Sequence, residues 1–320
     1  MKSLNCKKCR NCNEENNFYE LFSLGKLSYT GKFPKNENID IPKSEIKLVI
    51  CENCKLVQVS KEFDLNYMYD DNYGYRTGIN HTMKSHVKSI VNELSLKKNF
   101  LSKGDHVLDI ASNDATLLNS YSKNLTRVGI DPTINKYRKF YKNIDFKISN
   151  FFSKKRLINV IKNNKFKTIT ALAVFYDLKN PNQFLKEISE IIDEKKGIFI
   201  LEFQDLLSII KNNLFDTICH EHLGYYSTKI ILKMVKINNL KILDIKKNQI
   251  NGGSTRFYIC HKDANYKVKE NKIKKIIKYE LKFKLENKNT YKSFFKKITN
   301  IKKKLNKKIN DIKKKGKTIH

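Results

Sequence analysis

The sequence predicts an α/β protein with a doubly wound parallel sheet, preceded by a cysteine-rich module and followed by a basic helical extension. Three observations support this. Short apolar, β-branched runs alternate with helical stretches from about residue 106 to 200. Two CxxC pairs lie within the first 54 residues, and 266–315 shows apolar residues at helical spacing with Lys on the other face. We therefore expect three parts, covering residues 1–78, 79–262 and 263–320.

The first part contains the pairs Cys9-x2-Cys12 and Cys51-x2-Cys54. Each pair places two thiolates on one tight turn, and two such turns supply the four sulfur ligands of a structural zinc site. Cys6 is a spare that could replace Cys9 or Cys12 as a ligand. Free thiols or a redox pair are the alternatives, although redox chemistry needs only one pair. The spacing predicts structural Zn²⁺ on these four cysteines.

The central part contains the expected strands and helices of βαβ units. Strands are expected at 106–111, 127–131, 145–148, 168–174 and 197–203. Helices are expected at 116–121, after the second strand through residue 140, near 153–164 and near 183–193. A further strand is expected at 254–260, after a tight turn at Gly252 and Gly253 in which φ is positive. In such sheets, ligands bind at the carboxyl ends of the strands.

The loop after the first strand, residues 109–115, has the features of a cofactor loop. It starts with Asp109, and Asp131 closes the next strand, where a carboxylate can accept ribose hydroxyls. The loop has no Gly, whereas a dinucleotide site needs several so that backbone can touch the pyrophosphate. S-adenosylmethionine (SAM) fits better, and an ordinary polar loop is the alternative. The candidate cofactor-binding residues are Asp109, Ala111, Ser112, Asn113, Asp114, Asp131 and, after the third strand, Asn150.

A polar cluster, Cys219-His220-Glu221-His222, supplies two imidazoles and a carboxylate within four residues. In an extended segment, His220 and His222 share a face and Glu221 lies opposite. Such groups can remove a proton in general base catalysis. Metal binding by His-x-His is a rival interpretation, although no further acid or His obviously completes the ligand set.

Four segments together resemble a known family. They are Val-Leu-Asp-Ile-Ala-Ser-Asn-Asp-Ala-Thr-Leu-Leu (107–118), Gly-Ile-Asp-Pro (129–132), Phe-Asp-Thr-Ile-Cys-His-Glu-His (215–222) and Asn-Gly-Gly-Ser-Thr-Arg (251–256). With the two CxxC pairs, their order resembles the zinc-containing, SAM-dependent sugar C-methyltransferases. The resemblance implies a Rossmann-like class I SAM methyltransferase domain. It also implies methylation of a carbon next to the ketone of a nucleotide-linked keto-deoxysugar.

The resemblance also implies roles for individual residues. It places the catalytic base at His222, with Glu221 as a neighbouring acid and Tyr75 facing the sugar, and His220 is a further catalytic candidate in the same motif. The chain departs from the family at two positions, with Cys219 where the family usually has Tyr and Asp177 where many relatives have His.

The charge of the chain suggests nucleic acid at first sight. There are 64 Lys and Arg against 32 Asp and Glu, a net charge of +32, but only six of the basic residues are Arg. Because Arg is the side chain that reads base edges bidentately, this composition makes nucleic acid an unlikely partner. Residues 263–320 carry half of the net charge. Methylation of another acceptor such as RNA, and an inactive zinc/Rossmann binding protein, are the alternative functions.

The ends of the chain add two expectations. The first twelve residues have no apolar signal segment, and no apolar run reaches the roughly 18 residues of a membrane span, so a cytoplasmic protein without membrane association is expected. Lys315–His320 resembles the turn and first strand of a further α/β domain. We therefore expect a C-terminal domain that is truncated here.

Overall fold

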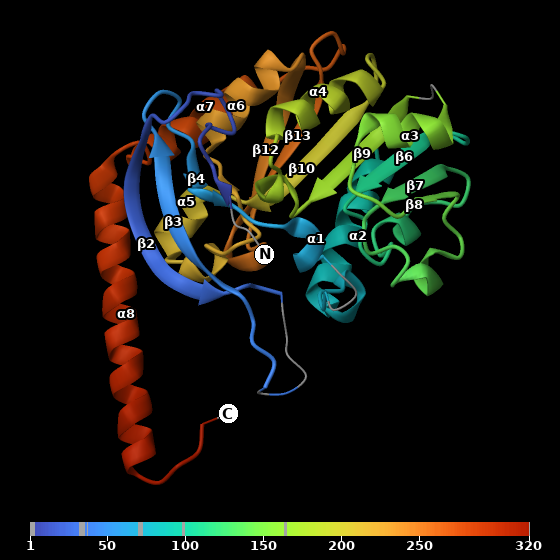
Figure 1. The fold of residues 1–320 in the computed structure, drawn as a ribbon. Coiled ribbons are helices and arrows are strands. Elements are labelled where there is room, and N and C mark those ends of the chain that lie inside the picture. The colour runs from blue at the N-terminus through green and yellow to red at the C-terminus, as the bar shows by residue number, and fades with distance from the viewer. Residues whose placement is uncertain are drawn as a thin grey trace.

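The computed structural model describes residues 4–31, 36, 38–69, 73–97, 100–162 and 165–319. Its centre is a seven-stranded sheet with the strand order β12-β13-β10-β9-β6-β7-β8 (Figure 1). The pairings among β6, β7, β8, β9 and β10 are parallel, and β13 pairs antiparallel with β10 and β12. The strands are β6 (His106–Ile110), β7 (Thr126–Ile130), β8 (Phe146–Ile148), β9 (Phe166–Leu172), β10 (Ile198–Gln204), β12 (Leu240–Asn248) and β13 (Ser254–His261).

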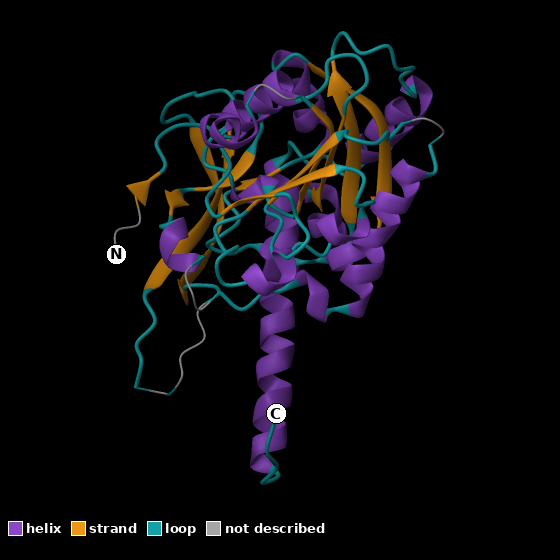
Figure 2. Ribbon diagram, turned by 90° about the vertical axis from the view of Figure 1, so that its right-hand side faces the viewer, coloured by secondary structure: helices purple, strands orange, loops and turns teal. Residues whose placement is uncertain are grey.

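Helices cover both faces of this sheet (Figures 1 and 2). On one face, apolar side chains of α3 (Lys154–Ile161), α4 (Pro181–Ile191) and α6 (Thr228–Ile237) pack against the sheet. On the other face, α2 (His81–Ser95) contributes four fully buried aliphatic side chains. The fold is therefore the expected Rossmann-like α/β fold of SAM methyltransferases.

Two expected helices are much shorter than their sequence pattern suggests. Only the 3-10 turns Leu118–Ser120 and Arg138–Tyr141 form at 116–121 and before 140. The Ser120 hydroxyl donates to the local Thr116 carbonyl, a type of bond that competes with regular helix formation. Asn119 donates to the Phe140 carbonyl, which connects the two turns.

The N-terminal module is a four-stranded antiparallel sheet with the order β11-β4-β3-β2. It consists of β2 (Phe18–Ser28), β3 (Lys43–Cys51), β4 (Val57–Val59) and β11 (Gly224–Tyr225), beside the small pair β1 (Leu4–Asn5) and β5 (Lys61–Glu62). The short helix α1 (Leu65–Met68) and the 3-10 turn Thr77–Ile79 lead from this module to α2. Strand β11 comes from beyond residue 78, so the sheet is completed by the central part of the chain.

The C-terminal part is helical, as expected, but divides into α7 (Glu270–Leu281) and α8 (Lys288–Lys314). The first turns of α8 pack on β2, where the rings of Phe22 and Phe295 stack with centroids 5.0 Å apart. The rest of α8 projects away from the body (Figure 1). A turn ends it at residues 315–316, and the described residues up to 319 form no strand; His320 lies outside the described part.

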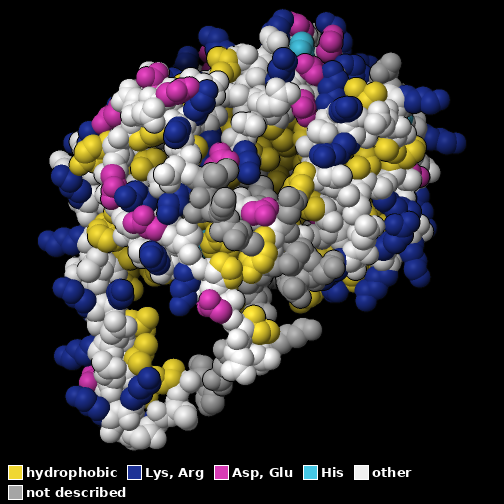
Figure 3. Space-filling view, viewed as in Figure 1, with side chains coloured by type: hydrophobic (Ala, Val, Ile, Leu, Met, Phe, Trp, Pro, Cys, Tyr) yellow, Lys and Arg dark blue, Asp and Glu magenta, His cyan; other side chains and the backbone are white. Residues whose placement is uncertain are grey.

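Basic side chains are spread over several elements of the face in Figure 3, with acidic side chains between them. Within the described residues, no helix is long and apolar enough to cross a membrane.

Candidate active site

The two CxxC pairs adopt the same local structure. In each, the backbone N–H four residues after the first cysteine donates to that cysteine's carbonyl: Asn13 to Cys9 and Lys55 to Cys51, both at 3.0 Å. Asn13 and Lys55 both have positive φ, near 60°. This conformation was hard to predict at Lys55, since Lys rarely adopts positive φ, whereas Asn is enriched there.

These matching turns bring four thiols together. The sulfurs of Cys9, Cys12, Cys51 and Cys54 lie within 4.8 Å of one another, with Cys9 and Cys54 3.5 Å apart. Four sulfurs in one cluster fit the donor set of a structural Zn²⁺ site. Cys6 is not in the cluster, since its thiol lies 3.1 Å from the Lys8 carbonyl, to which it donates. The arrangement favours the four predicted ligands over a substitution by Cys6.

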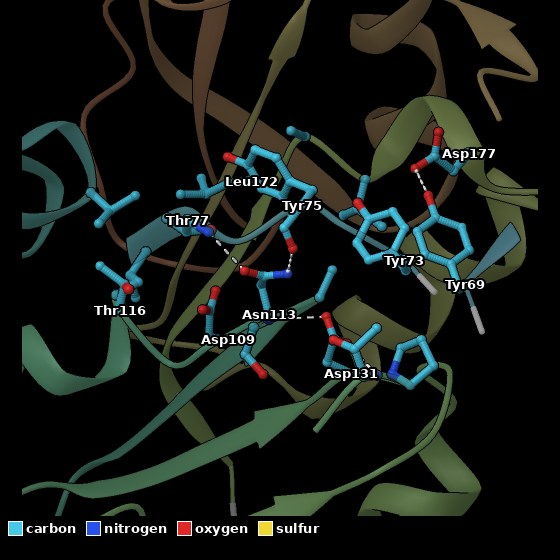
Figure 4. Close-up of a pocket in the computed structure, with 18 of the residues that line it drawn as sticks. Tyr69, Tyr73, Tyr75, Thr77, Asp109, Asn113, Thr116, Asp131, Leu172 and Asp177 are labelled. Atoms are coloured by element: carbon cyan, nitrogen blue, oxygen red, sulfur yellow. Dashed lines mark hydrogen bonds between the residues drawn. The ribbon is translucent and has the colours of Figure 1, made fainter. Parts of the chain in front are cut away.

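A cavity of about 280 Å³ opens at the carboxyl ends of the parallel strands (Figure 4). Asp109 lies near the end of β6, Leu172 is the last residue of β9, and Asp131 directly follows β7, so the strand ends supply one side of the lining. The other side comes from the segment between the N-terminal module and α2. Of the predicted cofactor residues, the cavity is lined by Asp109, Ala111, Ser112, Asn113 and Asp131.

Two buried carboxyls give this cavity its electrostatic character. Asp109 accepts a hydrogen bond from the Thr170 hydroxyl, and burial raises the pKa of its carboxyl to about 7. Asp131 accepts from the backbone N–H groups of Asn113 (2.9 Å) and Thr133 (2.6 Å), and burial raises its pKa as well. A cationic ligand with ribose hydroxyls would relieve the cost of ionising these two groups. The cavity therefore fits SAM.

The cofactor loop is also bound to the segment above it, which we call the strap (residues 73–79). The Asn113 side chain accepts from the Thr77 N–H (2.9 Å) and donates to the Tyr75 carbonyl (3.2 Å). Asp114 accepts from the Gly78 N–H at 2.9 Å. The strap thereby closes one side of the cavity.

Two predicted cofactor residues do not line the cavity. Asp114 faces the strap, and Asn150 accepts a hydrogen bond from the N–H of Phe151. The Phe151 ring lines the cavity in the region expected for Asn150. Thr77 and Gly78 of the strap were not predicted, because no local pattern in the sequence shows that they meet a loop 36 residues later.

The polar motif at 219–222 lies beside the cavity, behind one of its walls. The ring of His222 packs on that of Tyr176, which lines the cavity, with centroids 4.0 Å apart. His222 Nδ1 lies 2.7 Å from the Thr217 carbonyl oxygen. Because a carbonyl only accepts, Nδ1 carries the proton and Nε2 of the neutral ring has a free lone pair.

Two further acids belong to the same region. Burial raises the pKa of Glu221, and burial raises the pKa of Asp177 strongly, although the nearby His222 opposes both shifts. Asp177 accepts from the Tyr69 hydroxyl at 3.0 Å and lines the cavity (Figure 4). Burial thus lets both carboxyls take up a proton more readily than they would in water, as suits groups that exchange protons.

The remaining two catalytic candidates differ in their surroundings. Tyr75 lines the cavity and is 48% exposed, so its side chain is accessible to a ligand. His220 is fully buried between the rings of Tyr29 and Phe63, and burial lowers its pKa. The structure therefore brings His222, Glu221 and Tyr75 to the cavity region, and it places His220 in the core of the N-terminal module.

The Asn-Gly-Gly-Ser segment forms the tight turn with positive φ that its sequence predicts. Gly252 and Gly253 have φ of +80° and +135°, and β13 begins at Ser254. Asn251 from the same turn reaches the cavity lining.

The molecule has a SAM methyltransferase fold, as its strand order and the carboxyl-lined cavity at the strand ends indicate. A cysteine cluster lies beside this fold. Sequence comparison points to one class of methyltransferases. Residues 249–320 match the family described as the C-methyltransferase C-terminal domain. The chain is 21% identical over 265 residues to the C-methyltransferase NovU of Streptomyces niveus, a match that covers 82% of this chain and 62% of NovU. Both matches are to C-methyltransferases, the reaction class that the sequence motifs indicated.

Among solved structures, the chain is similar to a SAM-dependent methyltransferase from Clostridium acetobutylicum (14% identity, TM-score 0.45, covering 56% of this chain and 92% of that one). It is also similar to the magnesium protoporphyrin IX methyltransferase of Synechocystis (15% identity, TM-score 0.43, covering 59% and 90%).

Proposed function

We propose that the chain is a SAM-dependent C-methyltransferase that deprotonates the carbon next to the ketone of a nucleotide-linked deoxysugar and methylates the resulting enolate. The family matches support the reaction class. The observation that carries the proposal is the position of His222 beside the cavity, with Nδ1 fixed by the Thr217 carbonyl and Nε2 without a hydrogen-bond partner among the described residues. We further propose a cytoplasmic location and a structural Zn²⁺ on the four-cysteine cluster.

The cavity residues would hold the cofactor. Asp131 would accept the ribose hydroxyls, and Asp109 would be a further SAM contact. The loop sequence predicts Ser112, Asn113 and Asp114 at the amino-acid end, and of these Ser112 and Asn113 line the cavity. When bound, SAM supplies an electrophilic methyl group on a positively charged sulfur.

The base in this proposal is His222. Its Nε2 takes the proton from the carbon next to the ketone, and the electrons of the broken C–H bond move to the ketone oxygen to form an enolate. The enolate carbon is then the nucleophile. Glu221 and Asp177, whose pKa values burial raises, are suited to pass protons in this region.

Phenols on the cavity wall would stabilise the enolate oxygen. Tyr73 and Tyr75 both line the cavity. Burial raises the pKa of each, most strongly for Tyr73, so that they remain hydrogen-bond donors at neutral pH, whereas the Tyr69 hydroxyl already donates to Asp177. Donors of this kind stabilise a developing oxyanion.

The test is methyl transfer from SAM labelled on its methyl group. We expect label on a carbon of the nucleotide-linked keto-deoxysugar, seen as a new C-methyl signal by NMR, and none with the corresponding sugar that lacks the ketone. Label found on RNA instead would contradict the proposed acceptor. Failure of SAM to bind at all would contradict the enzyme assignment.

A further inference from the structure

Three metal-binding side chains meet at the proposed catalytic base. Donor atoms of Cys219, Glu221 and His222 all lie within 4.8 Å of one another. The Cys219 side chain is buried, and the other two are half-buried. None of these residues belongs to the four-cysteine cluster of the N-terminal module.

The free atoms of this group are suited to ligation. Oε1 of Glu221 is buried and has no hydrogen-bond partner among the described residues. His222 has its Nδ1 on a backbone carbonyl, which leaves Nε2 as the available donor. Metal-bound histidines show the same arrangement, in which the other ring nitrogen donates to a carbonyl or carboxylate and fixes the ring.

A further carboxyl, that of Asp177, lies near this group but outside the 4.8 Å set. Asp177 is next in sequence to Tyr176, whose ring packs on His222. One oxygen of the Asp177 carboxyl accepts from Tyr69, and the other, Oδ1, is buried without a hydrogen-bond partner in the described part of the chain. Unpartnered buried oxygens are costly, and a cation would satisfy them.

The donor types select the metal. A thiolate with an imidazole and a carboxylate suits Zn²⁺, whereas Mg²⁺ and Ca²⁺ prefer oxygen ligands alone. Zinc–ligand bonds of about 2.0–2.3 Å in a tetrahedron place donors roughly 3.3–3.8 Å apart. Side-chain rotations of modest size would therefore close the present spacing.

We propose that Cys219, Glu221 and His222 form a second Zn²⁺ site, with Asp177 as a candidate fourth ligand. The consequence for catalysis rests on the proposed function: a lone pair of Nε2 that binds zinc is unavailable to remove a proton. Zinc at this site therefore inhibits deprotonation, whereas zinc on the four-cysteine cluster does not.

Metal counting tests the site independently of activity. The full chain is stripped of metal, titrated with Zn²⁺ or Co²⁺, and the bound metal is quantified. We expect two equivalents for the unaltered chain, and one for both Cys219→Ala and His222→Gln. Cys260→Ala, which removes a buried cysteine on β13, is the matched control and should keep two. Circular dichroism checks that each variant is folded.

Cobalt gives a spectroscopic signature of the ligand type. The second equivalent should show a thiolate-to-cobalt charge-transfer band that Cys219→Ala removes and Cys260→Ala retains. One equivalent in the unaltered chain, or a second equivalent that survives in both site variants, would overturn the proposed site.

A kinetic measurement tests the inhibitory consequence. Zinc beyond the first equivalent should lower methyl transfer at least tenfold in the unaltered chain and in Cys260→Ala, relative to each protein's own activity without added zinc. In Cys219→Ala, this inhibition should be lost. Equal inhibition in all three proteins, or none in any, would overturn the inhibitory role. Absence of methyl transfer throughout would instead count against the proposed function, while the metal count still decides the site.

Discussion

The protonation state of Asp109 is coupled to ligand binding in the cavity. Its carboxyl is buried, and it lies at the end of the central strand β6. With a pKa of about 7, it is largely protonated at pH 6 and largely ionised at pH 8. A positively charged ligand favours the ionised form and lowers this pKa, so binding below pH 7 must release a proton.

We therefore predict that SAM binding at pH 6 releases roughly one proton per ligand and that affinity rises between pH 6 and pH 8. Calorimetry in buffers of different ionisation enthalpy measures the release. Asp109→Asn should abolish it, whereas Asp216→Asn, on an exposed carboxyl, should not. A binding enthalpy independent of the buffer at pH 6 in the unaltered chain would contradict this prediction.

The sequence predicted which loop faces the cavity, but it did not predict which side chains of that loop do so. Ser112 and Asn113 line the cavity, while Asp114 turns to the strap. The partner that turns it, the Gly78 N–H, lies 36 residues earlier in the chain. Short polar side chains at neighbouring positions look alike in a sequence until their long-range partners are placed.

The strap is the element that closes the cavity, and its fit depends on Gly78. A Cβ there would lie 2.5 Å from Oδ2 of Asp114 and 2.8 Å from Oγ1 of Thr116. Gly78→Ala should therefore displace the strap, destabilise the protein by about 1–3 kcal/mol and weaken SAM binding.

A double-mutant cycle with Asp114→Ala checks the cause. The cost of Gly78→Ala, measured by urea unfolding, should be smaller when the Asp114 carboxylate is absent. Equal costs in both backgrounds would show that the clash with Asp114 is not responsible.

The start of helix α8 is a second element that tertiary contacts hold in place. Phe294 is 2% exposed, with its ring 6.0 Å from that of Phe22 on β2. Phe294→Ala should cost about 3–5 kcal/mol of stability. Ile301→Ala, two turns further along the same helix at a position 39% exposed, should change stability by no more than about 0.5 kcal/mol in thermal unfolding. Similar losses for both variants would contradict the docking of α8.

Element types were more predictable than element lengths. The parallel strands stand out as short apolar runs, and all the expected ones form close to their predicted bounds. The helix expected over 266–315 breaks at 282–287, where Phe283 and Leu285 turn into the core around β2. Helical spacing of apolar residues indicates a helix, but it cannot show which tertiary contacts interrupt it.

For the whole molecule, the N-terminal module with its four-cysteine cluster and the proposed catalytic motif are one connected structure. Strand β11 begins two residues after His222 and pairs with β4 of the module, and β4 begins three residues after Cys54 of the second CxxC pair. The backbone that carries the base is thus held by the sheet that the cysteine turns support. The predicted boundary at residue 78 does not mark this connection, which arises only from the fold.

We therefore predict that removing metal from the four-cysteine cluster lowers methyl transfer more than it lowers SAM affinity. A chelator can remove the metal, and Cys54→Ala weakens the cluster without one. Cys6→Ala, outside the cluster, is the matched control. Activity and SAM affinity are measured on the same preparations. An unchanged activity in Cys54→Ala would contradict the coupling.

The most direct measurement of the central claim is exchange of the substrate's carbon-bound hydrogen. The nucleotide-linked keto-deoxysugar is incubated with the protein in D₂O, and deuterium at the carbon next to the ketone is followed by NMR. We predict that the unaltered chain and His81→Ala, which alters an exposed histidine, catalyse this exchange, and that His222→Ala slows it by about 10²–10⁴-fold. Exchange by His222→Ala at the unaltered rate would contradict the assignment of His222 as the base.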